Sequence, residues 1–169
     1  MTTNPLYDAL FAPHEGSGRV FLHLADGGSI SYATFLAQAN RTANALTALG
    51  IAPGDRVAVH VEKSPQALAL YAACIKAGVV FLPLNTAYTA KELDYFVGDS
   101  GAALFVCDPS EADAMTAIAQ AAGAQLRTLG PDGAGSLSDL AAAQSDRFDS
   151  VARGEDDLAA LLYTSGTTG

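Results

Sequence analysis

The stretch from Arg56 to Tyr163 alternates short apolar runs with segments of helical periodicity, and this alternation constrains the fold more than any other feature. Two parallel strands cannot be joined by a tight turn and need a crossover connection, which is usually a helix. The pattern therefore predicts an α/β fold with a mostly parallel sheet and helices on both faces. We expect strands over residues 56–61, 79–82, 104–107, 125–129 and 158–163, and helices over 65–77, 90–99, 111–122 and 137–143.

Residues that begin or end helices stand at the boundaries of these segments. Ser64 precedes a proline, a favourable first helical residue, and Gly78 follows the same apolar segment as a stop signal. Thr89 and Glu92 have the spacing of a capping box, in which the threonine and glutamate side chains each accept a free amide. Ser110 is expected to cap the next helix.

Smaller elements are predicted before this alternation begins. Asn4 followed by proline indicates a short helix that ends near residue 11. A strand from residue 20 is expected to turn at Asp26-Gly27-Gly28 and return through residues 29–31 as a hairpin. Apolar residues at helical spacing over 35–46 then indicate an amphipathic helix that ends before a glycine.

Composition argues against several kinds of partner. The 169 residues carry a formal net charge of −9 without a basic cluster, so we expect no binding to nucleic acid or to an anionic membrane. The apolar runs are too short to span a bilayer and the N-terminus lacks a secretory pattern, which predicts a cytoplasmic protein. Cys74 and Cys107 lack metal or disulfide spacing, so we expect two buried thiols.

The last seven residues, Tyr-Thr-Ser-Gly-Thr-Thr-Gly at 163–169, have two interpretations. Runs of Gly, Ser and Thr are often flexible linkers, and composition alone favours that interpretation. The stretch also follows an expected strand, and ligands of parallel sheets bind at the carboxyl ends of strands. Small residues expose backbone amides that can converge on phosphate, and hydroxyls add further donors. The common P-loop is excluded because no lysine is present in the stretch.

The same seven residues match the leading positions of the signature loop of the adenylate-forming superfamily. Three upstream segments, 30–35, 54–58 and 75–85, also resemble segments of that superfamily and occur in its order. The resemblance covers most of the chain. It implies that the α/β fold is part of the large N-terminal domain of an adenylate-forming enzyme.

The resemblance also implies an activity. Enzymes of this superfamily use Mg²⁺ and ATP to convert a carboxylate into an acyl-adenylate, and the acyl-CoA synthetases among them then transfer the acyl group to coenzyme A. By motif position, the residues expected to hold the β- and γ-phosphates of ATP are Thr164, Ser165, Gly166, Thr167, Thr168 and Gly169. The expected partners are therefore small molecules: ATP, coenzyme A and a carboxylate.

The acid substrate is suggested by a narrower resemblance. Residues 62–64, 83–89, 92–96 and 129–133 are similar to segments of malonyl-CoA synthetases, which favours malonate as the acid. These segments pack the sheet and do not contact the acid, so two alternatives stay open. One is a ligase for a fatty or aryl acid, and the other is a non-catalytic α/β module that binds a phosphorylated ligand.

The chain is expected to be an incomplete domain. The superfamily's loop continues to a lysine and a glycine, and its adenine, acyl, magnesium and catalytic residues come later still. We therefore expect residues 1–169 to be the N-terminal portion of an AMP-binding domain, with no catalytic or metal-binding residue of their own and no activity alone. His60 has no second metal ligand nearby, and Lys76 is interpreted as a solvated residue at a helix end.

Overall fold

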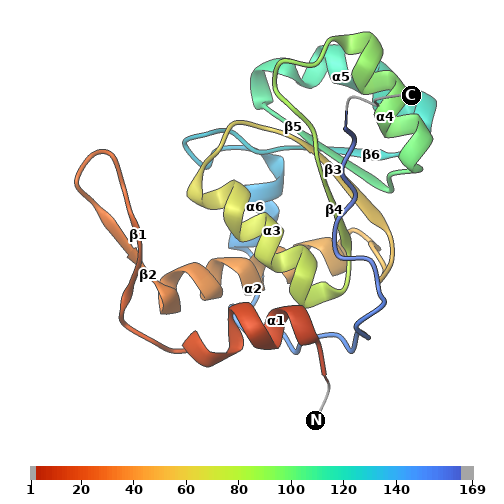
Figure 1. The fold of residues 1–169 in the computed structure, drawn as a ribbon. Coiled ribbons are helices and arrows are strands. Elements are labelled where there is room, and N and C mark those ends of the chain that lie inside the picture. The colour runs from red at the N-terminus through yellow and green to blue at the C-terminus, as the bar shows by residue number, and fades with distance from the viewer. Residues whose placement is uncertain (1–2, 165–169) are drawn as a thin grey trace.

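The computed structural model describes residues 3–164 of the chain (Figure 1). Strands and helices alternate through its middle as the sequence predicts. In chain order, the elements are α1 (Pro5–Leu10), the 3₁₀ turn η1 (Ala12–His14), β1 (Val20–His23), β2 (Ser29–Ser31), α2 (Tyr32–Ala48), β3 (Arg56–His60), α3 (Pro65–Ala77), β4 (Val80–Pro83), α4 (Ala90–Ser100), β5 (Leu104–Cys107), η2 (Pro109–Glu111), α5 (Ala112–Ala122), β6 (Gln125–Thr128) and α6 (Ser136–Ala142).

The central sheet has four parallel strands in the order β4-β3-β5-β6. Val57 of β3 lies between Phe81 of β4 and Leu104 of β5 in the register. The strands β1 and β2 form a separate antiparallel hairpin. The predicted α/β fold is thereby confirmed, and the carboxyl ends of all four parallel strands lie at one edge of the sheet.

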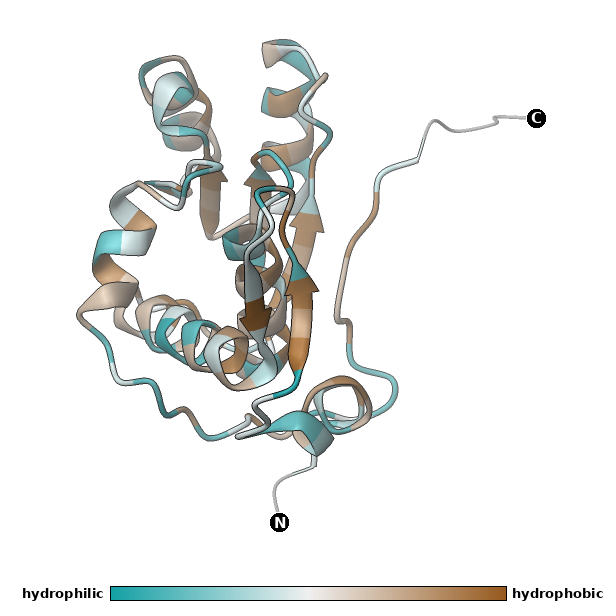
Figure 2. Ribbon diagram, turned by 90° about the vertical axis from the view of Figure 1, so that its left-hand side faces the viewer, coloured by the Kyte–Doolittle hydropathy of each residue, from teal (hydrophilic) through white to brown (hydrophobic). Residues whose placement is uncertain are grey.

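Helices cover both faces of this sheet (Figure 1). Helices α2, α3 and α6 pack one apolar cluster against it, and α4 and α5 pack a second cluster against the other face. Figure 2 shows that hydrophobic residues concentrate in the strands, as expected for strands buried on both sides. A third cluster joins α1 and the hairpin to α2 and α3.

The helix caps follow the sequence signals, with one exception. The amide of Ala67 donates to the Ser64 side chain at 3.1 Å, and Thr89 and Glu92 form the complete capping box. Gly78 ends α3 in the left-handed conformation, with φ of 69°. Ser110, in contrast, lies inside the 3₁₀ turn η2, because Asp108 accepts its amide and caps that turn instead.

The predicted buried strand over 158–163 is wrong as stated. Only one bridge forms, in which the amide of Phe81 donates to the carbonyl of Ala159 and the amide of Leu161 donates to the carbonyl of Phe81. Leu158 and Leu162 are 64% and 68% exposed. The segment lies outside β4 at the sheet margin, and the side chains of these two leucines remain exposed there.

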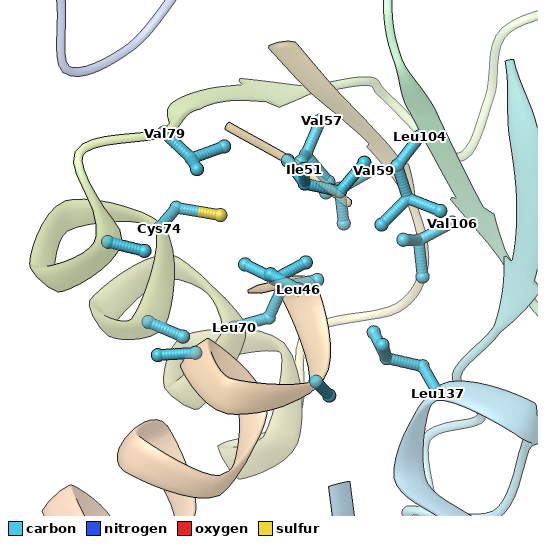
Figure 3. Packing of buried hydrophobic residues seen from close by; sticks show 14 of the residues in the cluster. Leu46, Ile51, Val57, Val59, Leu70, Cys74, Val79, Leu104, Val106 and Leu137 are labelled. Atoms are coloured by element: carbon cyan, nitrogen blue, oxygen red, sulfur yellow. The ribbon is translucent and has the colours of Figure 1, made fainter. Parts of the chain in front are cut away.

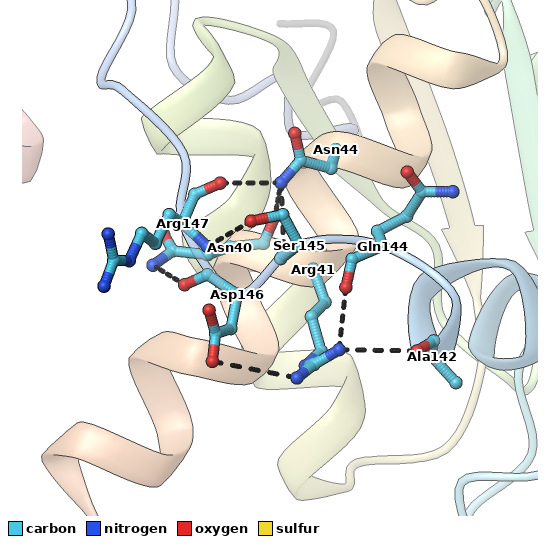
Figure 4. A network of polar contacts seen from close by, with 8 residues as sticks. All are labelled: Asn40, Arg41, Asn44, Ala142, Gln144, Ser145, Asp146 and Arg147. Atoms are coloured by element: carbon cyan, nitrogen blue, oxygen red, sulfur yellow. Dashed lines mark hydrogen bonds and ion pairs between the residues drawn. The ribbon is translucent and has the colours of Figure 1, made fainter.

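Side chains of α2 hold the chain that precedes this segment by hydrogen bonds (Figure 4). Asn40 donates to the carbonyl of Asp146 at 2.8 Å, and Asn44 donates to the carbonyls of Ser145 and Arg147, both at 2.9 Å. A further bond follows, from the amide of residue 151 to the carbonyl of residue 76. A stretch without regular secondary structure is thus held along the helical layer before it reaches β4.

We predict that Leu46→Ala lowers the free energy of unfolding by about 2–5 kcal/mol, because it leaves a cavity in the first apolar cluster. Leu46 is 0% exposed and points from α2 towards Leu70 and the β3 valines (Figure 3). Urea denaturation monitored by circular dichroism measures the change. Leu162→Ala is the matched control, and because Leu162 is exposed its effect should stay within about 0.5 kcal/mol. Equal effects of the two variants would contradict this packing.

Candidate functional site

The sequence-predicted phosphate loop begins at the carboxyl edge of the parallel sheet. Residue 160 pairs in parallel with Phe81, so the chain that follows runs in the direction of β4 and passes its carboxyl end. This is the edge at which ligands bind in open α/β sheets. Thr164, the first expected phosphate-binding residue, is exposed there and has no regular secondary structure.

The other five predicted loop residues, 165–169, lie outside the described residues. The expected contacts of Ser165, Gly166, Thr167, Thr168 and Gly169 with phosphate therefore stay a prediction. What the structure adds is the position of the chain as it enters this stretch, through residues 159–164.

The side chain of Tyr163 ties this entry to α4. Its hydroxyl donates to Oδ2 of Asp99 at 2.6 Å, and its ring packs on Phe96 with a centroid distance of 4.4 Å. The ring of Tyr95 lies on the same side at 6.5 Å, edge on. Tyr95, Phe96 and Asp99 are spaced by three and four positions, so they share one face of the helix.

The environment of Tyr163 extends the pH range over which its phenol stays protonated. Partial burial, followed by the hydrogen bond to the Asp99 carboxylate, raises the pKa of Tyr163 to about 12. A phenolate would also be repelled by the carboxylate. The hydroxyl therefore remains a donor at neutral pH, and the tie to α4 persists.

An open groove lies beside this edge, between the hairpin and the first turn of α3. It has a volume of about 1020 Å³, and residues at the ends of β3 and β4 contribute to its lining. Tyr71 and Phe81, whose rings meet edge on, are among its lining residues, as are Lys63 and Asn85. Its lining is mostly apolar, so it can receive a nonpolar group more readily than a free phosphate.

His60, at the end of β3, is buried but does not form part of a metal centre. It is 2% exposed, and its Nδ1 lies 3.1 Å from Oε2 of Glu111 on η2. Across residues 3–164, no group of three or more His, Cys, Asp or Glu side chains is placed to hold a metal ion. The chemistry of the described residues therefore does not fit a resident metal.

Lys76 is not the solvated residue that its position at the end of α3 suggested. It is 4% exposed, its Nζ lies 2.9 Å from Oε1 of Glu15, and it sits 4.6 Å above the ring of Tyr7. Tyr7 also donates to the same carboxylate oxygen at 2.6 Å. These partners offset the cost of burying the Lys76 ammonium group. Lys76 therefore helps to pack α1 on α3 and is not placed to bind an anion.

Comparisons with known proteins identify the family of this chain. The family model of the AMP-binding enzyme matches residues 12–169. The chain belongs to the AMP-binding enzyme family. This result confirms the resemblance to adenylate-forming enzymes.

Solved structures and curated relatives agree with that assignment. Apo MatB from Rhodopseudomonas palustris superposes with a TM-score of 0.93 at 52% identity, covering 99% of this chain and 33% of that one. The ATP-bound form of MatB gives a TM-score of 0.89 at 53% identity, covering 100% of this chain and 33% of that one. A feruloyl-CoA synthase from Amycolatopsis is 37% identical over 98% of this chain and 30% of its own length.

A long-chain-fatty-acid–CoA ligase, FadD13 of Mycobacterium tuberculosis, is 38% identical over 83% of this chain and 28% of its own length. The chain thus spans about a third of the length of the relatives it matches. None of the helices among residues 3–164 has the length and apolar character needed to cross a bilayer.

Sequence reasoning missed Asp99, which lies 64 positions before its partner Tyr163. One signal was present in the sequence. Asp99 stands in the last turn of a helix, where the helix dipole disfavours a carboxylate. A residue that does not suit its own helix is a candidate for an interaction with another part of the chain.

We predict that Asp99→Asn lowers the pKa of Tyr163 below about 12, because burial still raises it but the neutral amide no longer disfavours the phenolate. The raised pKa of Tyr163, due first to burial and then to this bond, stabilises the fold fully below the ordinary value of 10.0, and that contribution is lost as the pH rises through about 12. ¹³C-NMR titration of labelled tyrosine measures the shift. Asp94→Asn, an exposed carboxylate on the same helix, should leave it unchanged. A Tyr163 pKa that is the same in both variants would contradict the assignment.

Proposed function

We propose that residues 1–169 are the N-terminal portion of an AMP-binding domain in a longer, cytoplasmic acyl-CoA ligase, and that they end inside its phosphate-binding loop. Membership of the AMP-binding family supports this proposal, as do the named CoA ligases among the relatives. The observation that carries it is the course of residues 159–164 along β4 to the carboxyl edge, directly before the family's signature loop.

The proposed reaction has two steps. A carboxylate oxygen of the acid attacks the α-phosphorus of ATP, and the bond to the bridging oxygen breaks to release pyrophosphate. The thiol of coenzyme A then attacks the acyl carbon, loses its proton, and displaces AMP. The first step builds negative charge on the departing pyrophosphate, so donors fixed around the β- and γ-phosphates favour it.

In this proposal, the donors are the amides and hydroxyls of residues 164–169. They are neutral, which suits a triphosphate whose charge is met in part by Mg²⁺. Since residues 3–164 do not offer a metal site, we assign no part of the Mg²⁺ chemistry to this described part of the chain. Nor do we assign it a catalytic residue, and we expect residues 1–169 alone to be inactive.

Malonate is the acid that we propose for the full-length enzyme. The chain is 52% identical to MatB but 37% and 38% identical to the feruloyl- and fatty-acid relatives. This ranking by sequence identity agrees with the resemblance of segments of the chain, such as residues 83–89 and 129–133, to malonyl-CoA synthetases. A ligase for an aryl or fatty acid is the second candidate, because relatives with those names match nearly as much of the chain.

Acid-dependent exchange of pyrophosphate into ATP by the full-length enzyme tests both the proposed ligase class and the proposed acid. With malonate, ferulate and a long-chain fatty acid supplied in turn, we expect malonate to give a kcat/KM at least about tenfold above the others, because a paired second carboxylate adds binding energy. Residues 1–169 alone should give no exchange.

The outcomes separate the alternatives. Preference for ferulate or the fatty acid would overturn the malonate assignment and leave the ligase class intact. Absence of exchange with every acid would overturn the ligase assignment and favour a non-catalytic module that binds a phosphorylated ligand.

A further inference from the structure

Residues 159–164 are held to the sheet unevenly. Ala159 and Leu161 are fixed by backbone hydrogen bonds to Phe81, and the next residue, Leu162, is 68% exposed. Within the described part of the chain, no further backbone hydrogen bond is formed after Leu161. The side chain of Tyr163 is therefore the contact that holds the chain between the sheet and Thr164.

This contact reaches a helix, not the sheet. The Tyr163 hydroxyl donates to Oδ2 of Asp99 at 2.6 Å, within the range of short, charge-assisted hydrogen bonds. The ring stacks on Phe96, which belongs to the second apolar cluster. Because α4 is itself fixed by its capping box and by the burial of Leu93 and Val97, it provides a rigid support.

Asp99 has no evident role in the stability of α4. It lies in the last turn, where a carboxylate meets the negative end of the helix dipole. It is exposed, and of the described hydrogen bonds only that from Tyr163 involves its side chain. A cation or a neutral residue would suit this helix end better, so the bond to Tyr163 is the interaction that accounts for the aspartate.

We propose that Asp99 is a positioning residue for ATP, which acts through Tyr163 to fix the course of the chain into the phosphate-binding loop. The inference rests on the proposed function of residues 164–169. Consecutive Cα atoms are about 3.8 Å apart, so a shift of Tyr163 passes directly to Thr164. Displacement of a catalytic donor by about 1 Å is enough to impair the reaction.

A double-mutant cycle on the full-length enzyme tests the proposal. Tyr163→Phe keeps the ring and removes the donor, and Asp99→Ala removes the acceptor. Each is expected to raise the KM for ATP about fivefold to tenfold in pyrophosphate exchange with the acid that the wild-type enzyme prefers, the effect of losing one charge-assisted hydrogen bond. The KM for that acid should not change, and the double variant should resemble either single one.

Two controls separate positioning from a loss of fold. Tyr95→Phe removes a hydroxyl from the neighbouring ring, whose oxygen makes no hydrogen bond to the described residues, and should leave the KM for ATP unchanged. Asp99→Asn retains an oxygen that accepts the Tyr163 hydroxyl, and should recover most of the ATP affinity lost in Asp99→Ala. A purely structural defect would lower the folded fraction and hence kcat, without raising the KM for ATP.

Each outcome decides the proposal. Additive effects of the two variants, or a KM for ATP that matches the Tyr95→Phe control in a working enzyme, would overturn the positioning role alone. A wild-type enzyme without exchange for any acid would overturn the proposed function and, with it, this inference.

Discussion

The common direction of the four strands is the constraint on which the rest of this structure depends. Parallel strands require helical crossovers, and these crossovers cover both faces of the sheet and bury its apolar runs. They also place every carboxyl end at one edge. Residues 159–161 adopt the same direction when they pair with Phe81, so the chain up to Tyr163 runs along β4 in the sense of the other strands.

Much of this architecture was predictable from local sequence. The strands appear in the sequence as apolar runs bounded by turn residues. Helix ends are marked by Ser64, Gly78 and the Thr89–Glu92 pair, whose contacts lie within four positions along the chain. The prediction of a strand over residues 158–163 was wrong for a physical reason. An apolar run in the sequence does not indicate whether other elements will cover both sides of that segment. Residues 158–163 lie at the margin of the sheet, where Leu158 and Leu162 stay exposed.

The contacts that cross the fold were harder to predict. Lys76 meets Glu15 across 61 positions, and Tyr163 meets Asp99 across 64. Neither pair has a sequence spacing that identifies it, because each contact depends on how two distant segments of the chain are placed in space. For the candidate site, sequence supplied the loop residues 164–169 by resemblance, whereas the structure supplied the support beneath their first residue.

The central claim is that residues 164–169 hold the β- and γ-phosphates of ATP at the carboxyl edge of the sheet. A crystal structure of the full-length enzyme with ATP tests it most directly. The account predicts phosphate oxygens within about 3.2 Å of amides and hydroxyls of this loop, with the Tyr163–Asp99 hydrogen bond intact. A triphosphate bound away from this loop, with these donors unused, would contradict it.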